Sequence, residues 1–195
     1  MFRDNGENAV TNLWSDGLTL LQSDGAQVIG NRFENNSDVS FICGGARGAT
    51  FKDNQFLQST QVAFAAFMLD NFNGGVSGDF TGTTASGFTI ACTAQRCHFG
   101  VEIGPHAWYQ SANTIGGTVT GVTVTGARQG LNVEGGGTAA APVRVFGNSV
   151  TGSPASASFN CGTRATSDLN FSPDSFVDRA GDTTAATSVT WHGCP

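Results

Sequence analysis

Apolar and polar positions along the chain recur with a period of about 22 residues, the range expected for a solenoid repeat. One recurring segment reads A-x-Φ-x-(G/D)-N-x-F, where Φ is an apolar residue. Its copies, from the clearest to the weakest, are residues 26–33, 49–56, 143–150, 117–124 and 88–95. The pattern predicts a short strand centred on Φ in each copy, followed by a corner at the Asn.

A second family of segments lies between these copies and alternates apolar residues with smaller or polar ones. Its members are residues 18–20, 39–41, 62–64, 101–103 and 131–133. This alternation is typical of a strand with one buried face. The first and third residues of each segment, such as Val62 and Phe64, are therefore expected to point into a core.

The spacing of the two families favours a stack of coils. The step from the first family to the second is nearly constant at 11 residues: Val28 to Val39, Phe51 to Val62 and Ile90 to Val101. The return step varies widely, so one corner has a fixed length and the other accepts insertions. Stacked coils behave in this way, because each coil contacts only its neighbours and loops lengthen on one face.

The repeated asparagines predict a corner that runs along the stack. Asn31, Asn54 and Asn148 are each preceded by Gly or Asp. Asn tolerates the left-handed backbone that tight corners use, and its amide can bond to the coils above and below. An antiparallel sandwich would also have many short strands, but it would not explain a constant step with matching Asn corners.

The coil length, the N-x-F corners and the Gly- and Asn-rich turns resemble the right-handed parallel β-helix proteins of the pectate-lyase-like superfamily. The resemblance covers roughly residues 16–151 and implies an all-β solenoid of about five coils. It also implies a polysaccharide-binding groove along one outer face. The paired-aspartate signature of the polygalacturonase-like hydrolases and the arginine element of pectate lyases are both absent.

The chain divides into three parts on this pattern. Residues 16–151 carry the coils, and residues 152–195 lose the period and read as a loop-rich C-terminal cap. Residues 1–15 begin with Phe2-Arg3-Asp4-Asn5, which matches Phe33-Glu34-Asn35-Asn36 at the end of a repeat. We therefore expect either preceding coils or self-association at that end; the alternative is an irregular cap closed by Trp14.

Composition narrows the setting and the partners. The net charge is −6 and no Lys/Arg cluster occurs, which argues against nucleic acid. No apolar run reaches the length of a membrane span. Disulfides between Cys92 and Cys97, and between Cys161 and Cys194, would fit a secreted protein. The fifth cysteine, Cys43, is expected to point into the core.

Candidate chemistry gathers on the outward positions of the second strand family. The polar side chains there are Asp38, Gln61, Glu102, Asn132, Glu134 and His106. The insertions at residues 68–86 and 105–116 leave from the end of the same strands and would wall a groove. Within the second insertion, Trp108 and Tyr109 offer flat surfaces for stacking on sugar rings.

These residues suit two reactions on a polysaccharide. Glu102 and Glu134, on adjacent coils, would give the two carboxyls of a glycoside hydrolase, with Asp38 as a further candidate. A lyase would instead use His106 as a base, with Arg47 or Arg128 neutralising the uronate. The alternative is a non-catalytic glycan-binding or adhesive surface protein.

Two further interpretations complete the sequence-based picture. Asp16 lies in Trp14-Ser15-Asp16-Gly17 and reads as a turn residue. No cofactor motif occurs, and no metal site is predicted, although calcium stays open near Asp70 or Asp79.

Overall fold

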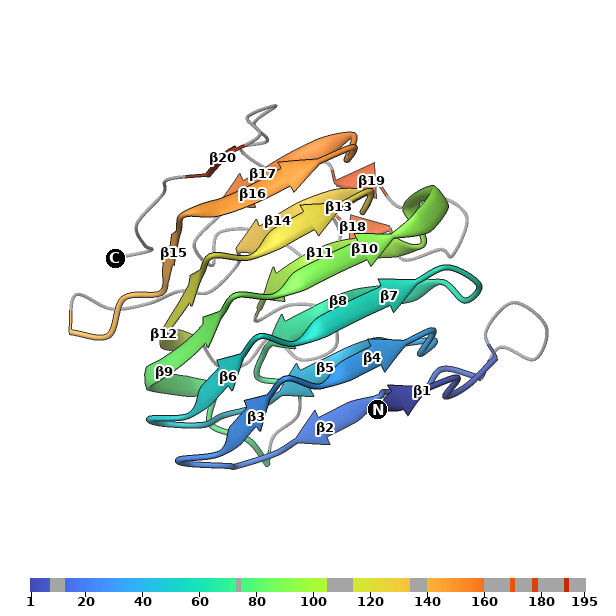
Figure 1. Ribbon diagram of the computed structural model, residues 1–195. Coiled ribbons are helices and arrows are strands. Elements are labelled where there is room, and N and C mark those ends of the chain that lie inside the picture. Colours follow the sequence, from blue (N-terminus) through green and yellow to red (C-terminus); the bar gives the residue numbers. More distant parts are fainter. Residues whose placement is uncertain are drawn as a thin grey trace.

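The protein is an all-β parallel solenoid of about four turns, as a computed structural model shows (Figure 1). The structure describes residues 1–7, 13–72, 75–104, 114–133, 140–159, 169–170, 177–178 and 188–189. Strands of successive coils lie one above another, from β1 at the bottom of Figure 1 to β16 near the top. The all-β solenoid expected from the repeat is confirmed.

Each coil contributes one strand to each of three parallel sheets. Sheet 1 contains β2 (Leu18–Leu20), β5 (Val39–Cys43), β8 (Ala63–Leu69), β11 (Cys97–Ile103), β14 (Gln129–Val133) and β17 (Ala155–Phe159). Sheet 2 contains β3 (Gln27–Ile29), β6 (Thr50–Lys52), β9 (Asp79–Ser86), β12 (Ile115–Thr120) and β15 (Arg144–Phe146). Sheet 3 contains β1 (Phe2–Arg3), β4 (Arg32–Glu34), β7 (Gln55–Gln58), β10 (Thr89–Cys92), β13 (Thr123–Thr125) and β16 (Asn148–Thr151).

Three short elements and one turn stand outside this scheme. β20 (Ser188–Val189) pairs antiparallel with β16 at the edge of sheet 3. β18 (Leu169–Asn170) and β19 (Val177–Asp178) form a separate antiparallel pair. A 3-10 turn, η1 (Thr93–Gln95), joins β10 to β11.

The sequence overestimated the number of turns, since five coils were expected and about four turns are present. Five stacked strands, as in sheet 2, are separated by four steps along the stack. The first sequence family also proved to be two strands rather than one, because its Asn corner separates sheet 2 from sheet 3. β3 and β4 together make up the copy at residues 26–33.

The register of the third coil differs from the sequence-based alignment in two places. Phe41 pairs with Phe67, not with Phe64, so Val62 precedes β8 and Phe67 occupies the core position. Ile90 pairs with Phe56 in sheet 3, and Ala85 takes the sheet 2 position that we assigned to Ile90. The alanine-rich run of β8 offers several equivalent alternations, so spacing alone selected the wrong one.

Phenylalanines fill the lower half of the core. Phe2, Phe33 and Phe56 stack face to face along sheet 3 with ring centroids 4.9 Å apart, the distance between neighbouring strands. Phe67 meets Phe41 from the coil below at 5.3 Å. The pairing of Phe2 with Phe33 confirms that residues 2–3 repeat the register of residues 33–34.

The asparagine corner forms between sheets 2 and 3, but through a different backbone than expected. Buried Asn54 accepts from the Asn31 backbone N–H at 2.9 Å and donates to the Val28 carbonyl at 2.8 Å. Asn148 makes the equivalent bonds to Val122 and Val119. The left-handed conformation belongs to the residue before each Asn, such as Gly30 (φ 66°) and Asp53 (φ 54°), which explains the Gly or Asp there.

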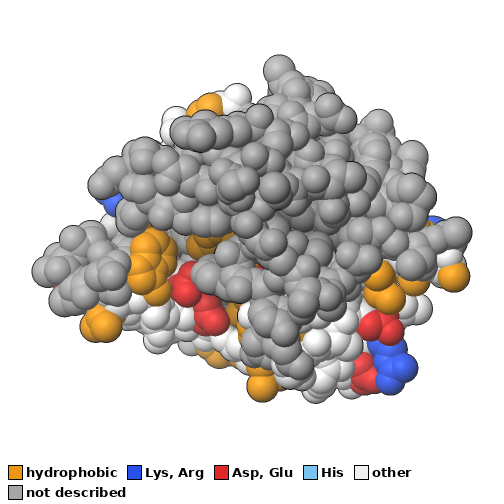
Figure 2. All heavy atoms as spheres, turned by 180° about the vertical axis from the view of Figure 1, so that it is seen from behind, with side chains coloured by type: hydrophobic (Ala, Val, Ile, Leu, Met, Phe, Trp, Pro, Cys, Tyr) orange, Lys and Arg blue, Asp and Glu red, His pale blue; other side chains and the backbone are white. Residues whose placement is uncertain are grey.

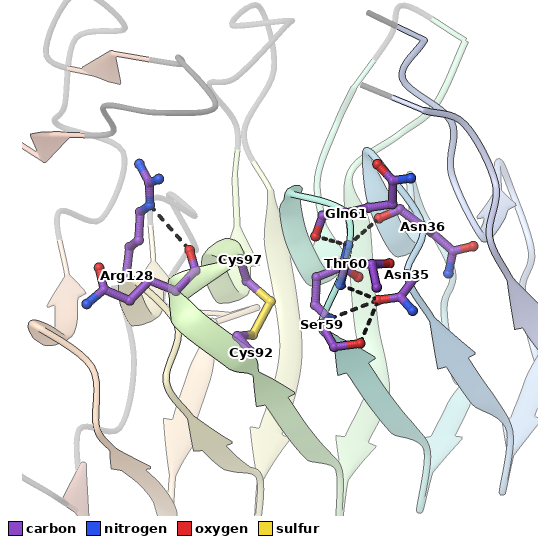
Figure 3. The surroundings of a disulfide bond; sticks show 10 residues. Asn35, Asn36, Ser59, Thr60, Gln61, Cys92, Cys97 and Arg128 are labelled. Atoms are coloured by element: carbon purple, nitrogen blue, oxygen red, sulfur yellow. Dashed lines mark hydrogen bonds between the residues drawn. A yellow bond between two sulfur atoms is a disulfide. The ribbon is translucent and has the colours of Figure 1, made fainter. Parts of the chain in front are cut away.

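The corner from sheet 3 to sheet 1 carries a disulfide in one coil and a hydrogen-bonded asparagine in another (Figure 3). Cys92 and Cys97 are joined, as expected, across η1. In an earlier coil, the Asn35 side chain accepts from the backbone N–H groups of Ser59 and Thr60. The Cys161–Cys194 pair falls outside the described residues.

Cys43 is a free, fully buried thiol in the core, as its strand phase predicted. Burial raises its pKa to about 11, which leaves the thiol protonated and unreactive. Within the described ranges, no helix is long and apolar enough to cross a membrane.

Candidate functional site

The outer side of sheet 1 is the side on which candidate residues were expected, and it carries a layer of its own. Thr19, Ile42, Met68, Glu102 and Asn132 pair in register along the stack. Their neighbours Phe41, Phe67 and Val101 belong to the core, so strand alternation points this row outward. A second apolar cluster covers the lower part of this side: Val39, Ile42, Phe64, Ala65, Met68 and Phe99, with Phe72 packed against them.

A cleft opens at the lower edge of that cluster. Its volume is about 260 Å³, and it is lined by Asp16, Asp38, Ile42 and Phe72. Asp16, Asp38 and Phe72 are partly exposed, so the cleft is accessible to solvent. Viewed from behind, the molecule shows acidic side chains directly beside hydrophobic ones (Figure 2).

Asp16 is held in place by the adjacent coil and by its own strand. One carboxyl oxygen accepts from the Val39 backbone N–H at 3.1 Å, and the other accepts from the Thr19 hydroxyl at 2.6 Å. Burial raises the pKa of Asp16, while these two donors favour its carboxylate and oppose the rise. Its geometry is therefore fixed by the start of β2 and the start of β5.

Asp38 lies immediately before β5, one coil from Asp16. Its backbone N–H donates to the Ser15 carbonyl at 3.3 Å, so the two acids lie on adjacent coils. The backbones of neighbouring strands are about 4.8 Å apart. Burial, and secondarily the charge of Asp16, raises the pKa of Asp38 to about 7. Among the described residues, none donates a hydrogen bond to this carboxyl.

The two acids thus have different surroundings within one cleft. Asp16 has donors that stabilise a charge, whereas Asp38 has an environment that keeps its proton up to near-neutral pH. Pairs of carboxyls whose environments differ in this sense act as acid and base, or as acid and nucleophile, in hydrolytic enzymes. The arrangement can protonate a leaving group from Asp38 while Asp16 is ionised.

Phe72 reaches the cleft on the segment that follows β8. Ser77 of this segment donates its backbone N–H to the Gln22 side chain at 2.6 Å. Phe72 and Val76 lie so close to Gly44 that a Cβ there would stand 2.7 Å from both side chains. The absence of a side chain at Gly44 therefore lets an aromatic ring lie over the outer side of sheet 1.

A buried polar chain continues along the upper coils. The Gln129 amide donates to the Asn132 side chain at 3.0 Å, and the Asn132 amide donates to Glu102 at 2.6 Å. All three side chains are at most 1% exposed. The Asp70 carboxyl, also fully buried, lies against Gly104 on the neighbouring strand end.

This burial changes the interpretation of Glu102 and Asn132. Both were expected on an open outer surface, and both are on the outward side of sheet 1 but have no exposed area. An outward position on this sheet is therefore not necessarily exposed to solvent. Of the candidate carboxyls that the structure describes, Asp38 is the accessible one.

The remaining nominated residues are dispersed. Gln61 precedes β8 at the corner between sheets 3 and 1, where its backbone carbonyl accepts from the Gln58 amide (Figure 3). Arg128 is near the disulfide at a similar corner and donates to the Gln95 carbonyl at 3.3 Å. Arg47 pairs with Asp24 at 2.7 Å, between β5 and β6. Neither arginine lines the Asp16–Asp38 cleft.

Several nominated residues are outside the part of the chain that the structure describes. They are Glu134, His106, Trp108 and Tyr109. The described residues contain no group of three or more His, Cys, Asp or Glu side chains that could hold a metal ion. Asp70 and Asp79, near which calcium was left open, belong to no such group.

Asp16 and Phe72 line the cleft but were not among the candidate residues that the sequence suggested. Asp16 was interpreted as a turn residue because it lies in a W-S-D-G segment. It comes 22 residues before Asp38, which is one coil length. That spacing was the available signal for two stacked carboxyls. No family model, curated protein or solved structure matches this chain.

Proposed function

We propose that the protein is a carbohydrate-active hydrolase that cleaves glycosidic bonds in the Asp16–Asp38 cleft. The observation that carries the proposal is the pair of carboxyls on adjacent coils, of which Asp38 has a pKa of about 7. Glycoside hydrolysis uses two carboxyls on opposite sides of the scissile bond, one protonated and one ionised. A solenoid supports such a site well, because its stacked strands form a rigid base.

The roles follow from the surroundings of each acid. Asp38 keeps its proton at mildly acidic pH and donates it to the leaving glycosidic oxygen. Asp16, with two hydrogen-bond donors on its carboxylate, acts as the nucleophile or activates the attacking water. Phe72 offers a flat apolar surface on which a sugar ring can stack.

Hydrolysis is favoured over the lyase reaction by the positions of the arginines. A lyase needs a base together with a cation that neutralises the uronate carboxylate. Arg47 is paired with Asp24, and Arg128 is bound to the Gln95 carbonyl, so neither serves the cleft. The disulfide is consistent with a secreted protein, and we include that setting in the proposal.

The test is release of new reducing ends from a panel of polysaccharides. The wild-type protein is compared with Asp38→Asn and Asp16→Asn, and Asp53→Asn, an exposed carboxyl in another corner, is the matched control. We expect either cleft substitution to lower kcat at least 100-fold and the control to leave it unchanged. Activity in Asp38→Asn equal to wild type would disprove the assignment.

The same assay separates the glycan-binding alternative. A non-catalytic adhesive protein would bind a polysaccharide without releasing reducing ends, and Asp38→Asn would not alter binding. Absorbance of unsaturated products would instead point to a lyase and contradict the roles given to Asp16 and Asp38.

A further inference from the structure

The Asp16–Asp38 cleft contains two acids and, within the described part of the chain, no basic side chain. Its lining consists of these acids with Ile42 and Phe72. Burial and the neighbouring Asp16 shift the pKa of the Asp38 carboxyl. Burial and two hydrogen bonds shift the pKa of Asp16. No lysine or arginine among the described residues acts on either acid.

The described lysine and arginine side chains are engaged elsewhere. They form pairs on other surfaces (Arg3 with Asp4, Arg32 with Glu34, Arg47 with Asp24, Lys52 with Asp53) or donate to carbonyls at corners (Arg96 to Thr60, Arg128 to Gln95). Arg144 is exposed on β15 of sheet 2, which is not the sheet that carries the cleft. An anionic ligand in the cleft would therefore find no described lysine or arginine as a counter-charge.

We infer that the substrate is a neutral polysaccharide, not a uronate. This inference rests on the proposed function, since it names the substrate of the same cleft. A uronate places one carboxylate on each ring, next to an ionised Asp16, and the protein as a whole carries a net charge of −6. A like charge about 6 Å away at an effective dielectric constant near 20 weakens binding roughly 100-fold.

The apolar part of the lining supports the same conclusion. Ile42 and Phe72 present hydrocarbon and aromatic surface beside the acids. Neutral sugar rings have C–H faces that pack on such surfaces and hydroxyl groups that hydrogen-bond to carboxyls. The cleft thus combines a stacking surface with hydrogen-bond acceptors, and both ionisable side chains among its described lining residues are acids.

The experiment uses one glycan in two charge states. A panel of neutral and uronate polysaccharides first identifies a glycan that the full chain cleaves, measured as new reducing ends. The preferred neutral glycan is then oxidised at its C6 hydroxyls, which converts its rings to uronates without changing the backbone. We expect kcat/KM to fall roughly 100-fold on oxidation at low salt, and to recover in part at high salt because salt screens the repulsion.

A matched pair of variants tests the cause of that preference. Phe72→Arg introduces a cation into the lining, whereas Phe72→Ala removes the same ring without adding charge. We expect Phe72→Arg to raise the ratio of uronate to neutral turnover at least tenfold over Phe72→Ala. Equal ratios in the two variants would overturn the electrostatic explanation.

The outcomes separate this inference from the proposed function. Asp38-dependent cleavage of a uronate in preference to every neutral glycan overturns the inference and leaves the hydrolase in place. If no glycan of the panel is cleaved, the proposed hydrolase function is wrong. Binding affinities for the same panel then test whether the cleft prefers neutral glycans. Tighter binding of the neutral glycans supports this inference, and tighter binding of the uronates, or no binding of either class, overturns it.

Discussion

Ionisation of Asp38 is expected to weaken the folded protein as the pH rises, and Asp38→Asn should abolish this effect. The folded pKa of Asp38 is about 7, against 3.8 for an ordinary Asp. The folded state therefore holds the proton more tightly than the unfolded state does. The stabilisation is complete below pH 3.8 and is lost as the pH rises through 7.

The size of the effect follows from the two pKa values. Each unit of difference corresponds to about 1.4 kcal/mol, so full ionisation would cost the folded state about 4 kcal/mol. Asp38 is partly exposed at the cleft, and water stabilises the charged form there. We therefore expect about half of this, near 2 kcal/mol, between pH 4 and pH 8.

Urea denaturation at pH 4 and pH 8 measures this difference. Relative to wild type, Asp38→Asn should gain about 2 kcal/mol in the free energy of unfolding on going from pH 4 to pH 8. Asp53→Asn, which replaces an exposed carboxyl outside the cleft, is the matched control variant. A gain below about 0.5 kcal/mol for Asp38→Asn would refute the argument that burial and Asp16 hold the proton on Asp38.

Three further predictions test the fold. Asn54→Ala should lower the free energy of unfolding by about 2–3 kcal/mol, because it removes two buried hydrogen bonds between coils. The control Asn31→Ala should lower it by under about 0.5 kcal/mol. Equal losses would contradict the corner assignment. Phe67→Ala should cost about 3–5 kcal/mol in urea denaturation through the cavity it leaves, and a loss under about 1 kcal/mol would argue against its core position. Replacing Cys92 and Cys97 together by Ala should cost about 2 kcal/mol, the loop entropy of a short bridge, and reducing the wild type should lower its thermal midpoint to that of the double variant.

The parallel solenoid could be predicted because it is encoded locally and repeatedly. The N-x-F segment recurs, its spacing to the next strand is nearly constant, and only stacked coils reconcile both features. The amide of Asn54 bonds to the neighbouring coil as the repeat implied. The disulfide between Cys92 and Cys97 was predictable for the same reason, since both ends lie in one short corner.

The register of the third coil could not be predicted from the sequence. In Val62–Leu69 almost every residue is apolar, so the period of two that marks an inward face is lost. Only pairing with Phe41 below and Val101 above selected Phe67 as the core residue. A strand buried on both sides has no local signal for its register, because alternation depends on one side facing water.

The candidate site divides between sequence and structure in the same way. The sequence by itself indicated that Asp38 lies outside the core of a stack of coils. The strict alternation assumed for β5 does not hold at its start, because Val39 joins Ile42 in the outer cluster. Only the tertiary structure decided that Asp16 stands beside it, that Glu102 is buried, and that the arginines are elsewhere. The physical reason is that burial and pKa depend on which coils and loops pack together. The pattern of apolar and polar residues indicates the direction of a side chain, but it does not indicate what covers that side chain.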